Sequence, residues 1–416
     1  MEKQSGTYYF EYLVLGFTLH AIGGFTRTVF SNDLMMILFG TIGWYFIIKG
    51  YLHIRGRLSQ NGMGGMYNAL LIFYLFQCIV MIVRGYMIDY PYQWISVNGM
   101  LNFHLFHKTY ILAYLMPLVC FIPWQYYHLE KYIKYASWVG VIAVITFVVF
   151  FPKILQTSMI AMAGFEFEKA DSGIDYRFYA PFSFAPLLVA YMTKKSWINN
   201  VLGLASLLLI SMIAARRGSS LINAIVFVAT IYMWSRYKEQ RIGILAKFFF
   251  VLLIGFGVYF VLNSSLFGFL FQRGFEDNRS GVDEALLSQM NEVQLIFGKG
   301  LNGRYYYPLL MDDYLDGWRF NSETGFYTIV LRGGYLMAFT YIVLLAIPAF
   351  KGMFRSRNYL CKAGGFYIFV SLLDLYPFGL LEFSIKFLII WMMVVLCMNR
   401  YVRAMDDEEI RQQFFK

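Results

Sequence analysis

The chain has 416 residues, of which 59% are hydrophobic and only 14% are charged, and its formal net charge is +10. Soluble domains are about 45–50% apolar and about 25% charged, so this composition excludes a soluble protein and indicates an integral membrane protein. The positive charge does not require a nucleic-acid partner, because lysines and arginines gather in the cytoplasmic loops that flank transmembrane segments. We therefore expect a protein that lies in a lipid bilayer and binds no nucleic acid.

Hydrophobic windows along the chain predict about twelve transmembrane helices, since a span needs about 20 mostly apolar residues. The first window is too long for a signal peptide and lacks a small-residue cleavage site, so we expect it to be the first span. The sixth window carries Pro181 and Pro186, which are tolerated where neighbouring helices satisfy the backbone. The windows are residues 8–28, 33–50, 66–84, 109–127, 135–152, 176–192, 197–215, 219–235, 247–266, 324–350, 363–380 and 383–399.

The distribution of basic residues predicts the orientation of these spans. With the N-terminus in the cytoplasm, about 20 of the lysines and arginines lie in cytoplasmic segments, which is the bias that membrane proteins show. Both termini are then cytoplasmic, and the end of the chain, residues 401–416, is predicted to be a short, charged and solvated tail. The four cysteines all fall in apolar runs, so we expect them to be small buried hydrophobic residues.

One long polar connector interrupts the hydrophobic pattern between residues 266 and 322, and the predicted orientation places it on the outer side. A connector of this size is usually functional where the other connections are short. The expected organisation is transmembrane helices one to nine in residues 1–266, a large outer loop in 267–322, transmembrane helices ten to twelve in 323–400, and the tail in 401–416.

The connector contains a pattern typical of an amphipathic helix. Ser280 and Asp283 form a candidate capping box at its start, and Gly298 is a plausible stop. Such a helix outside the bilayer would lie on the interface or roof a cavity between spans. The predicted helix covers residues 281–297, and its apolar stripe is Val282, Leu286, Met290, Val293 and Phe297.

Arginines are the first candidates for binding an anionic ligand. Arg216 and Arg217, followed by Gly218, end the seventh span on the side where basic residues are disfavoured. A guanidinium makes bidentate contacts with phosphate, although such a pair can also extend to lipid headgroups. Arg279 precedes the positive end of the predicted helix, which attracts anions as well. The other candidates are Arg273, Arg304, Arg319 and Arg332.

These other arginines leave two interpretations open. For Arg273, Arg304 and Arg319, a surface ion pair is as good an explanation as a ligand contact. Arg332 lies about two turns into the tenth span, where an unpaired charge is costly. We expect it to pair with an acidic residue of the loop or to face a polar cavity.

A carboxylate at the mouth of the tenth span is the candidate general base. Glu323 follows Asn321 and Ser322, and partial desolvation there would favour proton abstraction. The alternative is that this segment caps the helix that follows. Asp374 and Glu382 flank the turn between the last two spans, where capping and hinge roles are the better interpretation.

Two other motifs carry weaker signals. Residues 298–303 match the pattern GxGxxG, but no strand–turn–helix unit surrounds them, so we reject a dinucleotide site. His104 and His107 could share one face of a helix, but the sequence offers no third ligand near them. We expect neither a metal nor a cofactor.

In several of these residues the chain resembles the O-antigen polymerase and ligase superfamily, which comprises the Wzy-type polymerases and the WaaL-type ligases. Arg217-Gly218 at the end of a mid-chain span matches one motif of the family. Arg279, the predicted helix and the turn at Gly298–Gly300 follow the order of the family's large loop. Ligases show a His-Asn pair at the next span, whereas this chain has Glu323 at the reactive position. This departure favours a polymerase over a ligase.

The resemblance implies a GT-C-like glycosyltransferase of the bacterial inner membrane, active at its periplasmic face without a metal. Donor and acceptor would both be glycans on undecaprenyl diphosphate, and a chain-length regulator and a flippase would be partners. Arg217 and Arg279, with Arg216, would hold the diphosphate, and Glu323 would take the proton of the acceptor hydroxyl. The loop aromatics Tyr305, Tyr306, Tyr307 and Trp318 would stack on sugars.

Three alternatives stay open at this point. A ligase would perform the same transfer to a different acceptor. A transporter or flippase of lipid-linked sugars would fit the hydrophobic composition, but transporters favour internal repeats and short loops, and this chain shows no repeat and one long loop. A structural subunit of an envelope assembly is a further, weaker alternative.

Overall fold

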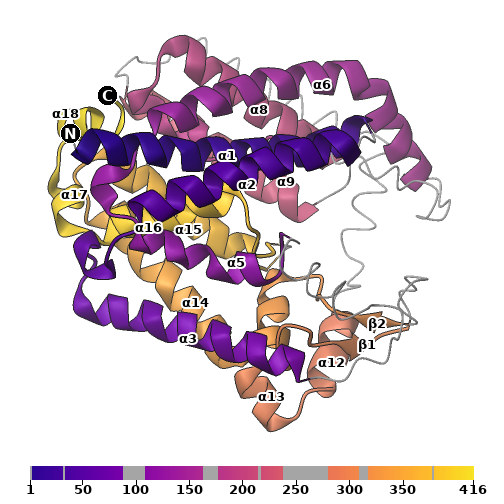
Figure 1. Cartoon of the computed structure of the whole chain (residues 1–416). Coiled ribbons are helices and arrows are strands. Elements are labelled where there is room, and N and C mark those ends of the chain that lie inside the picture. The colour runs from indigo at the N-terminus through magenta and orange to yellow at the C-terminus, as the bar shows by residue number, and fades with distance from the viewer. Residues whose placement is uncertain are drawn as a thin grey trace. The chain divides into compact units, whose positions relative to one another are not determined.

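The computed structural model describes residues 2–30, 33–87, 108–162, 177–213, 217–237, 280–308, 317–376 and 379–416. Within these ranges the chain is helical, apart from one ladder of two short strands, β1 (Tyr305–Tyr306) and β2 (Trp318–Arg319) (Figure 1). The predicted all-α class therefore holds for the described part of the chain.

Six of the described helices are long and apolar enough to cross a membrane, as an all-α membrane protein requires. The helix over the first predicted span, α1 (Glu2–Phe30), is not among them, and the predicted span at 247–266 lies outside the described residues. The last two predicted spans form shorter apolar helices, α15 (Tyr359–Asp374) and α16 (Ile385–Met398). The six belong to α2 (Asp33–Ile54), α3 (Gly65–Tyr86), α6 (Glu130–Met162), α8 (Lys194–Ile213), α9 (Arg217–Tyr237) and α14 (Gly325–Phe354).

Two predicted spans are not continuous α-helices. The window 109–127 begins with the short helix α5 (Ile111–Leu115) and continues as the 3-10 helices η2 (Met116–Phe121) and η3 (Trp124–Tyr126). The window 176–192 forms two more 3-10 helices, η4 (Ala180–Phe182) and η5 (Ala185–Tyr191). Pro117, Pro181 and Pro186 each stand in the first turn of a 3-10 helix. A proline lacks the amide hydrogen and crowds the preceding turn, so an α-helix does not run through these positions.

The chain divides into two compact units, and the smaller comprises residues 25–32 and 136–278. Within it α6 and α8 pack at backbone contact, because a Cβ on Gly140 would lie 2.4 Å from the carbonyl oxygen of Asn199. Nearby, the hydroxyl of Tyr179 donates to the side chain of Asn200 at 2.8 Å. Arg217 opens α9 in this unit.

The larger unit comprises residues 1–24, 33–135 and 279–416 and contains all the other candidate residues that the structure describes. Its core is formed by α14, α15 and α16, where Gly352 and Gly365 let two helices approach closely. The helix α3 packs on α14, and the hydroxyl of Tyr67 donates to the carbonyl of Leu344 at 2.6 Å. The cysteines Cys78, Cys120, Cys361 and Cys397 are all buried, as predicted.

Hydrogen bonds of Asn61 join three segments of the larger unit that lie far apart in the sequence. Its side-chain amide donates to the carbonyl of Cys120, and its side-chain oxygen accepts from the amide of Trp124 at 3.0 Å. Its backbone carbonyl accepts from the side chain of Asn399 at 2.9 Å. Asn399 also caps α17 (Arg400–Ala404), so one residue both starts a helix and closes this joint.

The predicted solvated tail is wrong for residues 401–416. They form most of α17 and the helix α18 (Asp407–Phe414), which has a capping box between Asp406 and Glu409. One face of α18 is apolar, and Ile410 and Phe414 are fully buried. The amide of Leu129 donates to the carbonyl of Phe414 at 2.8 Å, so the segment docks on the protein. The charged composition concealed this one apolar face.

Candidate functional site

Several predicted site residues cannot be placed. Arg216, Arg273 and Arg279, with His104 and His107, lie outside the described residues. Arg217 is the first residue of α9, but its side chain is not described, and α9 belongs to the smaller unit. The site that can be built therefore consists of the described part of the long connector and the first half of α14, all within the larger unit.

The predicted single amphipathic helix is in fact two helices, α12 (Ser280–Ser288) and α13 (Glu292–Phe297). The chain breaks between them because Asn291 caps α13, accepting from the amide of Gln294 at 2.9 Å. Of the predicted stripe, Val282, Leu286 and Met290 are buried, whereas Val293 and Phe297 are exposed. The predicted stop is correct, since α13 ends at Phe297 and Gly298 has a φ of +73°.

The segment after α13 is bound to a kink in α14. Gly334 has φ +75° and ψ 177°, so the helix changes direction there and the carbonyls before it lose their helical partners. Two backbone amides of the connector donate to these carbonyls in place of the lost helical donors. Lys299 donates to the carbonyl of Leu331 at 2.7 Å, and Gly300 donates to that of Arg332 at 2.9 Å.

Glycines are required where these backbones meet. A Cβ on Gly298 would lie 2.2 Å from the carbonyl oxygen of Arg332, and one on Gly300 would lie 2.5 Å from the amide nitrogen of Gly85. The same segment also binds the end of α3, because Leu301 donates to the carbonyl of Met81 at 3.0 Å. The glycines of the GxGxxG match thus serve close packing of the connector between α3 and α14.

The strands β1 and β2 form an antiparallel ladder in which Tyr305 is opposite Arg319 and Tyr306 is opposite Trp318. The side-chain amide of Gln289, the residue after α12, extends this ladder. It donates to the carbonyl of Tyr306 at 2.9 Å and accepts from its amide at 2.8 Å. Sequence reasoning missed Gln289, and no pattern in the sequence marks it.

Aromatic rings and cations gather on this hairpin. The guanidinium of Arg304 lies 4.8 Å from the ring centre of Trp318, and the ring of Tyr306 meets Trp318 edge-on. The ammonium of Lys299 donates to the carbonyl of Arg304 at 3.0 Å. Burial lowers the pKa of Lys299, and the positive charge of Arg304 lowers it further. A ligand that stacks on Trp318 would therefore meet a positive rim.

Tyr305 differs from its neighbour on the same strand. Its ring is fully buried, and its hydroxyl donates to the backbone carbonyl of Asn321 at 3.1 Å. Burial raises the pKa of Tyr305 to about 12. In this structure the ring is not available for stacking on a sugar, and its contact supports the segment before α14.

Glu323 stands directly before α14 but does not cap it. The cap is Thr324, whose hydroxyl accepts from the amide of Tyr327 at 3.2 Å. One carboxylate oxygen of Glu323 lies 3.8 Å from the guanidinium of Arg319, and a third of its side chain is exposed. Of the two interpretations of this segment, capping belongs to Thr324, which leaves the carboxylate of Glu323 accessible beside a cation.

Ser322 and Asp283 attach this turn to α12. The hydroxyl of Ser322 donates to the carboxylate of Asp283 at 2.7 Å and accepts from the amide of Thr324 at 3.2 Å. Asp283 was predicted to take part in a capping box, but the residue before Ser280 lies outside the described residues. The contact that is seen fixes the turn carrying Glu323 to the connector.

Arg332 is buried, and of its two predicted surroundings, a loop acid or a polar cavity, the loop acid is not among its partners in the described residues. Its guanidinium donates to the carbonyl of Thr109 at 2.8 Å and to the side-chain oxygen of Asn321 at 2.6 Å, and it lies 4.5 Å from the ring centre of Tyr110. In the described part of the chain it forms no ion pair with a carboxylate, and its Nε has no hydrogen-bond partner there. In place of the expected loop acid, the guanidinium of Arg332 therefore binds the side-chain amide of Asn321.

A shallow hollow lies beside Arg332. Polar side chains line one part of its wall and leucines another, and its residues come from α5, α14, the turn before α14 and the turn between α15 and α16. The acidic residues that flank the latter turn are paired, Asp374 with Lys386 at 2.8 Å and Glu382 with Lys108 at 3.3 Å. The lining residues are Thr109, Tyr114, Asn321, Gly325, Thr328, Ile329, Arg332, Leu380 and Leu381.

Comparisons of the chain with protein-family models, with curated proteins and with solved structures found no match.

Proposed function

We propose that the chain is a polysaccharide polymerase that joins oligosaccharide repeat units carried on undecaprenyl diphosphate. It would be a metal-independent glycosyltransferase with about twelve transmembrane helices in a GT-C-like arrangement. The connector would lie on the periplasmic side of the bacterial inner membrane, with both termini in the cytoplasm. The apolar helices and the sequence motifs support this proposal.

The observation that carries the proposal is the exposure of the Glu323 carboxylate and its place beside Arg319. Its carboxylate is partly exposed and stands 3.8 Å from Arg319, while Thr324 performs the capping that could otherwise have explained an acidic residue there. A general base needs an accessible carboxylate on a fixed segment. The contacts of Ser322 with Asp283 and of Asn321 with Arg332 supply that fixation.

The other residues take roles that match their chemistry. Arg217 and Arg279, with Arg216, would hold the diphosphate and offset the charge that builds on the leaving group. Trp318 and Tyr306 would stack on a sugar ring, with Arg304 at its rim. Arg319 would orient Glu323, and Asn321 and Arg332 would hold its segment. Arg273 stays in the proposal as a further contact to the donor.

The test is a gel of surface and lipid-linked glycans from a deletion strain complemented with wild type, Glu323→Gln, Arg217→Ala or Glu284→Gln. Glu284 is exposed on α12 and serves as the matched control. We expect wild type and Glu284→Gln to restore a ladder of polymer, while Glu323→Gln and Arg217→Ala give a single repeat unit at an equal protein level.

Other outcomes would assign the chain to a different class. Full-length polymer that stays on the lipid carrier in the deletion strain would mean a ligase, which performs the same chemistry on another acceptor. A normal ladder in the deletion strain would remove both enzymes, because neither transfer would then depend on this chain. A normal ladder with both site variants would remove Glu323 and Arg217 from the mechanism.

A further inference from the structure

The helix α13 exposes three large apolar side chains on one face. Val293 is 59% exposed, Ile296 50% and Phe297 45%, and the spacing of three and four residues places them together on the helix surface. The preceding helix behaves in the opposite way, because Val282, Leu286 and Met290 are buried. The first half of the predicted stripe thus faces the protein, and the second half faces away from it.

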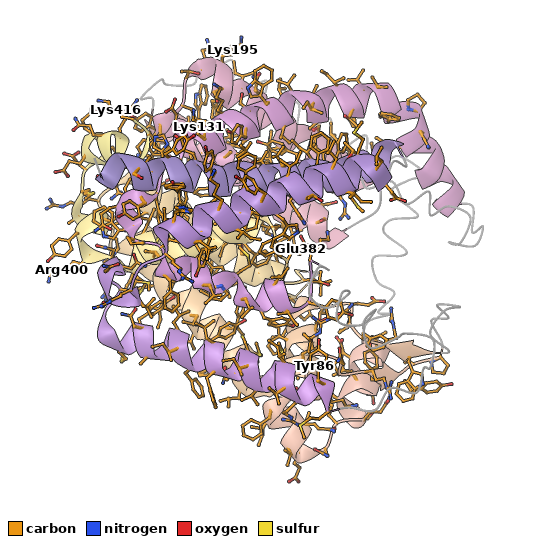
Figure 2. All side chains as sticks on the ribbon, in the orientation of Figure 1. Tyr86, Lys131, Lys195, Glu382, Arg400 and Lys416 are labelled. Carbon is orange, nitrogen blue, oxygen red and sulfur yellow. The ribbon has the colours of Figure 1, made fainter. Side chains whose placement is uncertain are left out.

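α13 is held firmly, so the exposure of this face does not come from a loose segment. The guanidinium of Arg84, in the last turn of α3, donates to the carbonyl of Phe297 at 3.2 Å. A Cβ on Gly334 would lie 2.1 Å from the carbonyl oxygen of Ile296, so α13 touches the kink of α14 directly. The helix therefore sits between α3 and α14, beside Tyr86 at the end of α3 (Figure 2).

Both helices that hold α13 also expose large apolar side chains. On α3, exposed apolar side chains include Phe76, Ile79 and Val83, and on α14 they include Tyr335 and Phe339, which follow the kink. Both helices are long and apolar enough to cross a membrane. Their exposed apolar side chains are those that lipid would cover, so α13 packs against helices that already require a bilayer.

Helix lengths place α13 at the boundary of that bilayer. The part of α14 beyond Gly334 runs to Phe354, and its roughly 20 residues span about 30 Å. The hydrocarbon core of a bilayer is also about 30 Å thick. The kink at Gly334 and the end of α3 at Tyr86 therefore lie near the same boundary, and α13 packs against both.

We infer that α13 is an interfacial helix whose face of Val293, Ile296 and Phe297 inserts between the lipids at the membrane surface. Amphipathic segments with an exposed apolar face bind the headgroup–acyl boundary in this way. The partner is the bilayer lipid itself, and the inference does not depend on the proposed glycan chemistry. It also places Arg332, two residues before the kink, at the edge of the hydrocarbon, where a buried charge costs less than at the membrane centre.

Single spin labels test this directly in nanodiscs of phosphatidylethanolamine and phosphatidylglycerol. The four native cysteines are buried, so cysteines introduced at Val293, Ile296 and Phe297 can be labelled selectively. Cysteines at Glu284 and Ser288, exposed polar positions of α12, are the controls. Accessibility of each label is measured to oxygen, which partitions into lipid, and to a water-soluble nickel chelate.

We expect the ratio of oxygen to nickel accessibility to be several-fold higher at the three α13 positions than at the two α12 controls. High nickel accessibility at all three would overturn the inference, because the face would then be in water. Exclusion of both reagents would also overturn it, because the cover would be protein. Quenching of a bimane label at Val293 by brominated lipid, compared with Ser288, gives a second measure that reports contact with acyl chains.

Discussion

The guanidinium of Arg332 lies 2.6 Å from the side-chain oxygen of Asn321, which stands two residues before Glu323. The same guanidinium donates to the carbonyl of Thr109, so it joins the turn before α14 to the start of α5. Arg332 is 1% exposed and has little surface for a ligand. Its two hydrogen bonds therefore hold the segment that carries Glu323.

The first prediction concerns this contact. Asn321→Ala leaves one side of a buried guanidinium without its acceptor, which typically costs about 1–3 kcal/mol of stability. We expect a lower midpoint of thermal unfolding in detergent and, in a polymerase assay on lipid-linked repeat units, a lower kcat with little change in KM. A higher KM at unchanged kcat would instead make Asn321 a group that binds substrate.

The matched control for this change is Ser288→Ala. Ser288 is exposed and its hydroxyl bonds only within α12, to the carbonyl of Ala285, so its removal should move the midpoint little. The double variant Asn321→Ala with Arg332→Lys closes a cycle. If both residues act through one contact, the double variant should be hardly worse than the more damaging single variant.

The second prediction separates two costs of replacing Gly300: the strain of its backbone conformation and the steric clash of an added Cβ. Both Gly300 and Gly64 have φ near +90°, at 94° and 93°, but a Cβ on Gly64 would meet nothing within 4 Å. Gly64→Ala should therefore show only the cost of a rarely populated backbone conformation, about 1–3 kcal/mol. Gly300→Ala should cost clearly more, because its Cβ would collide with the backbone of Gly85 and push the connector off α3. Equal losses in thermal stability would show that the connector is not clamped there.

The third prediction distinguishes stability from activity at Arg319. An ion pair at this degree of exposure contributes about 0–1 kcal/mol, so Arg319→Ala should barely change the unfolding midpoint. We nevertheless expect shorter polymer on a glycan gel, because the carboxylate of Glu323 loses the cation that orients it. Arg319→Lys should restore part of the length. Full-length polymer with Arg319→Ala would remove Arg319 from the site.

The fourth prediction follows from the buried hydroxyl of Tyr305. Its pKa in the folded protein is about 12, against about 10 in an unfolded chain. Between these two pH values the unfolded state loses the proton that the folded state keeps, so stability falls as pH rises from 10 to 12. The ultraviolet phenolate absorbance of wild type minus Tyr305→Phe should show one tyrosine titrating near pH 12. A step near pH 10 would mean that the ring is solvated.

The fifth prediction tests the docking of α18. Phe414→Ala removes a fully buried ring and should cost about 3–5 kcal/mol, seen as a large fall in thermal midpoint. Tyr401→Ala is the control, since that side chain is 76% exposed in the neighbouring α17. Equal and small effects of both substitutions would show that the segment is solvated, as its composition suggests, and not docked.

Much of the helical framework could be predicted from composition, because long apolar windows have few other structures available to them. The windows 33–50 and 66–84 lie on helices that can cross a membrane, as do residues 197–213 and 325–350 of two further windows. Windows containing Pro117, Pro181 or Pro186 form 3-10 helices, each with a proline in its first turn. Hydropathy averages over such local breaks and cannot detect them.

The candidate site was predictable in its residue types but not in its contacts. Glu323, Arg319 and Trp318 stood out as charged or aromatic residues beside a span, and the structure brings them together on one hairpin and turn. The partners of Arg332 come from a backbone carbonyl and an amide, which any sequence offers everywhere. The break at Asn291 was visible as a good helix cap, but the periodic apolar pattern on either side of it favoured one helix.

The joint between Asn61 and Asn399 bears on how the chain is made. These residues are 338 positions apart, and synthesis at 5–20 residues per second separates them by roughly 20 to 70 s. Throughout that interval the turn at Asn61, between α2 and α3, lacks its hydrogen bond from Asn399. The larger unit is therefore completed late in translation. An insertase or chaperone that shields incomplete helix bundles would have to cover the first three helices for the longest time.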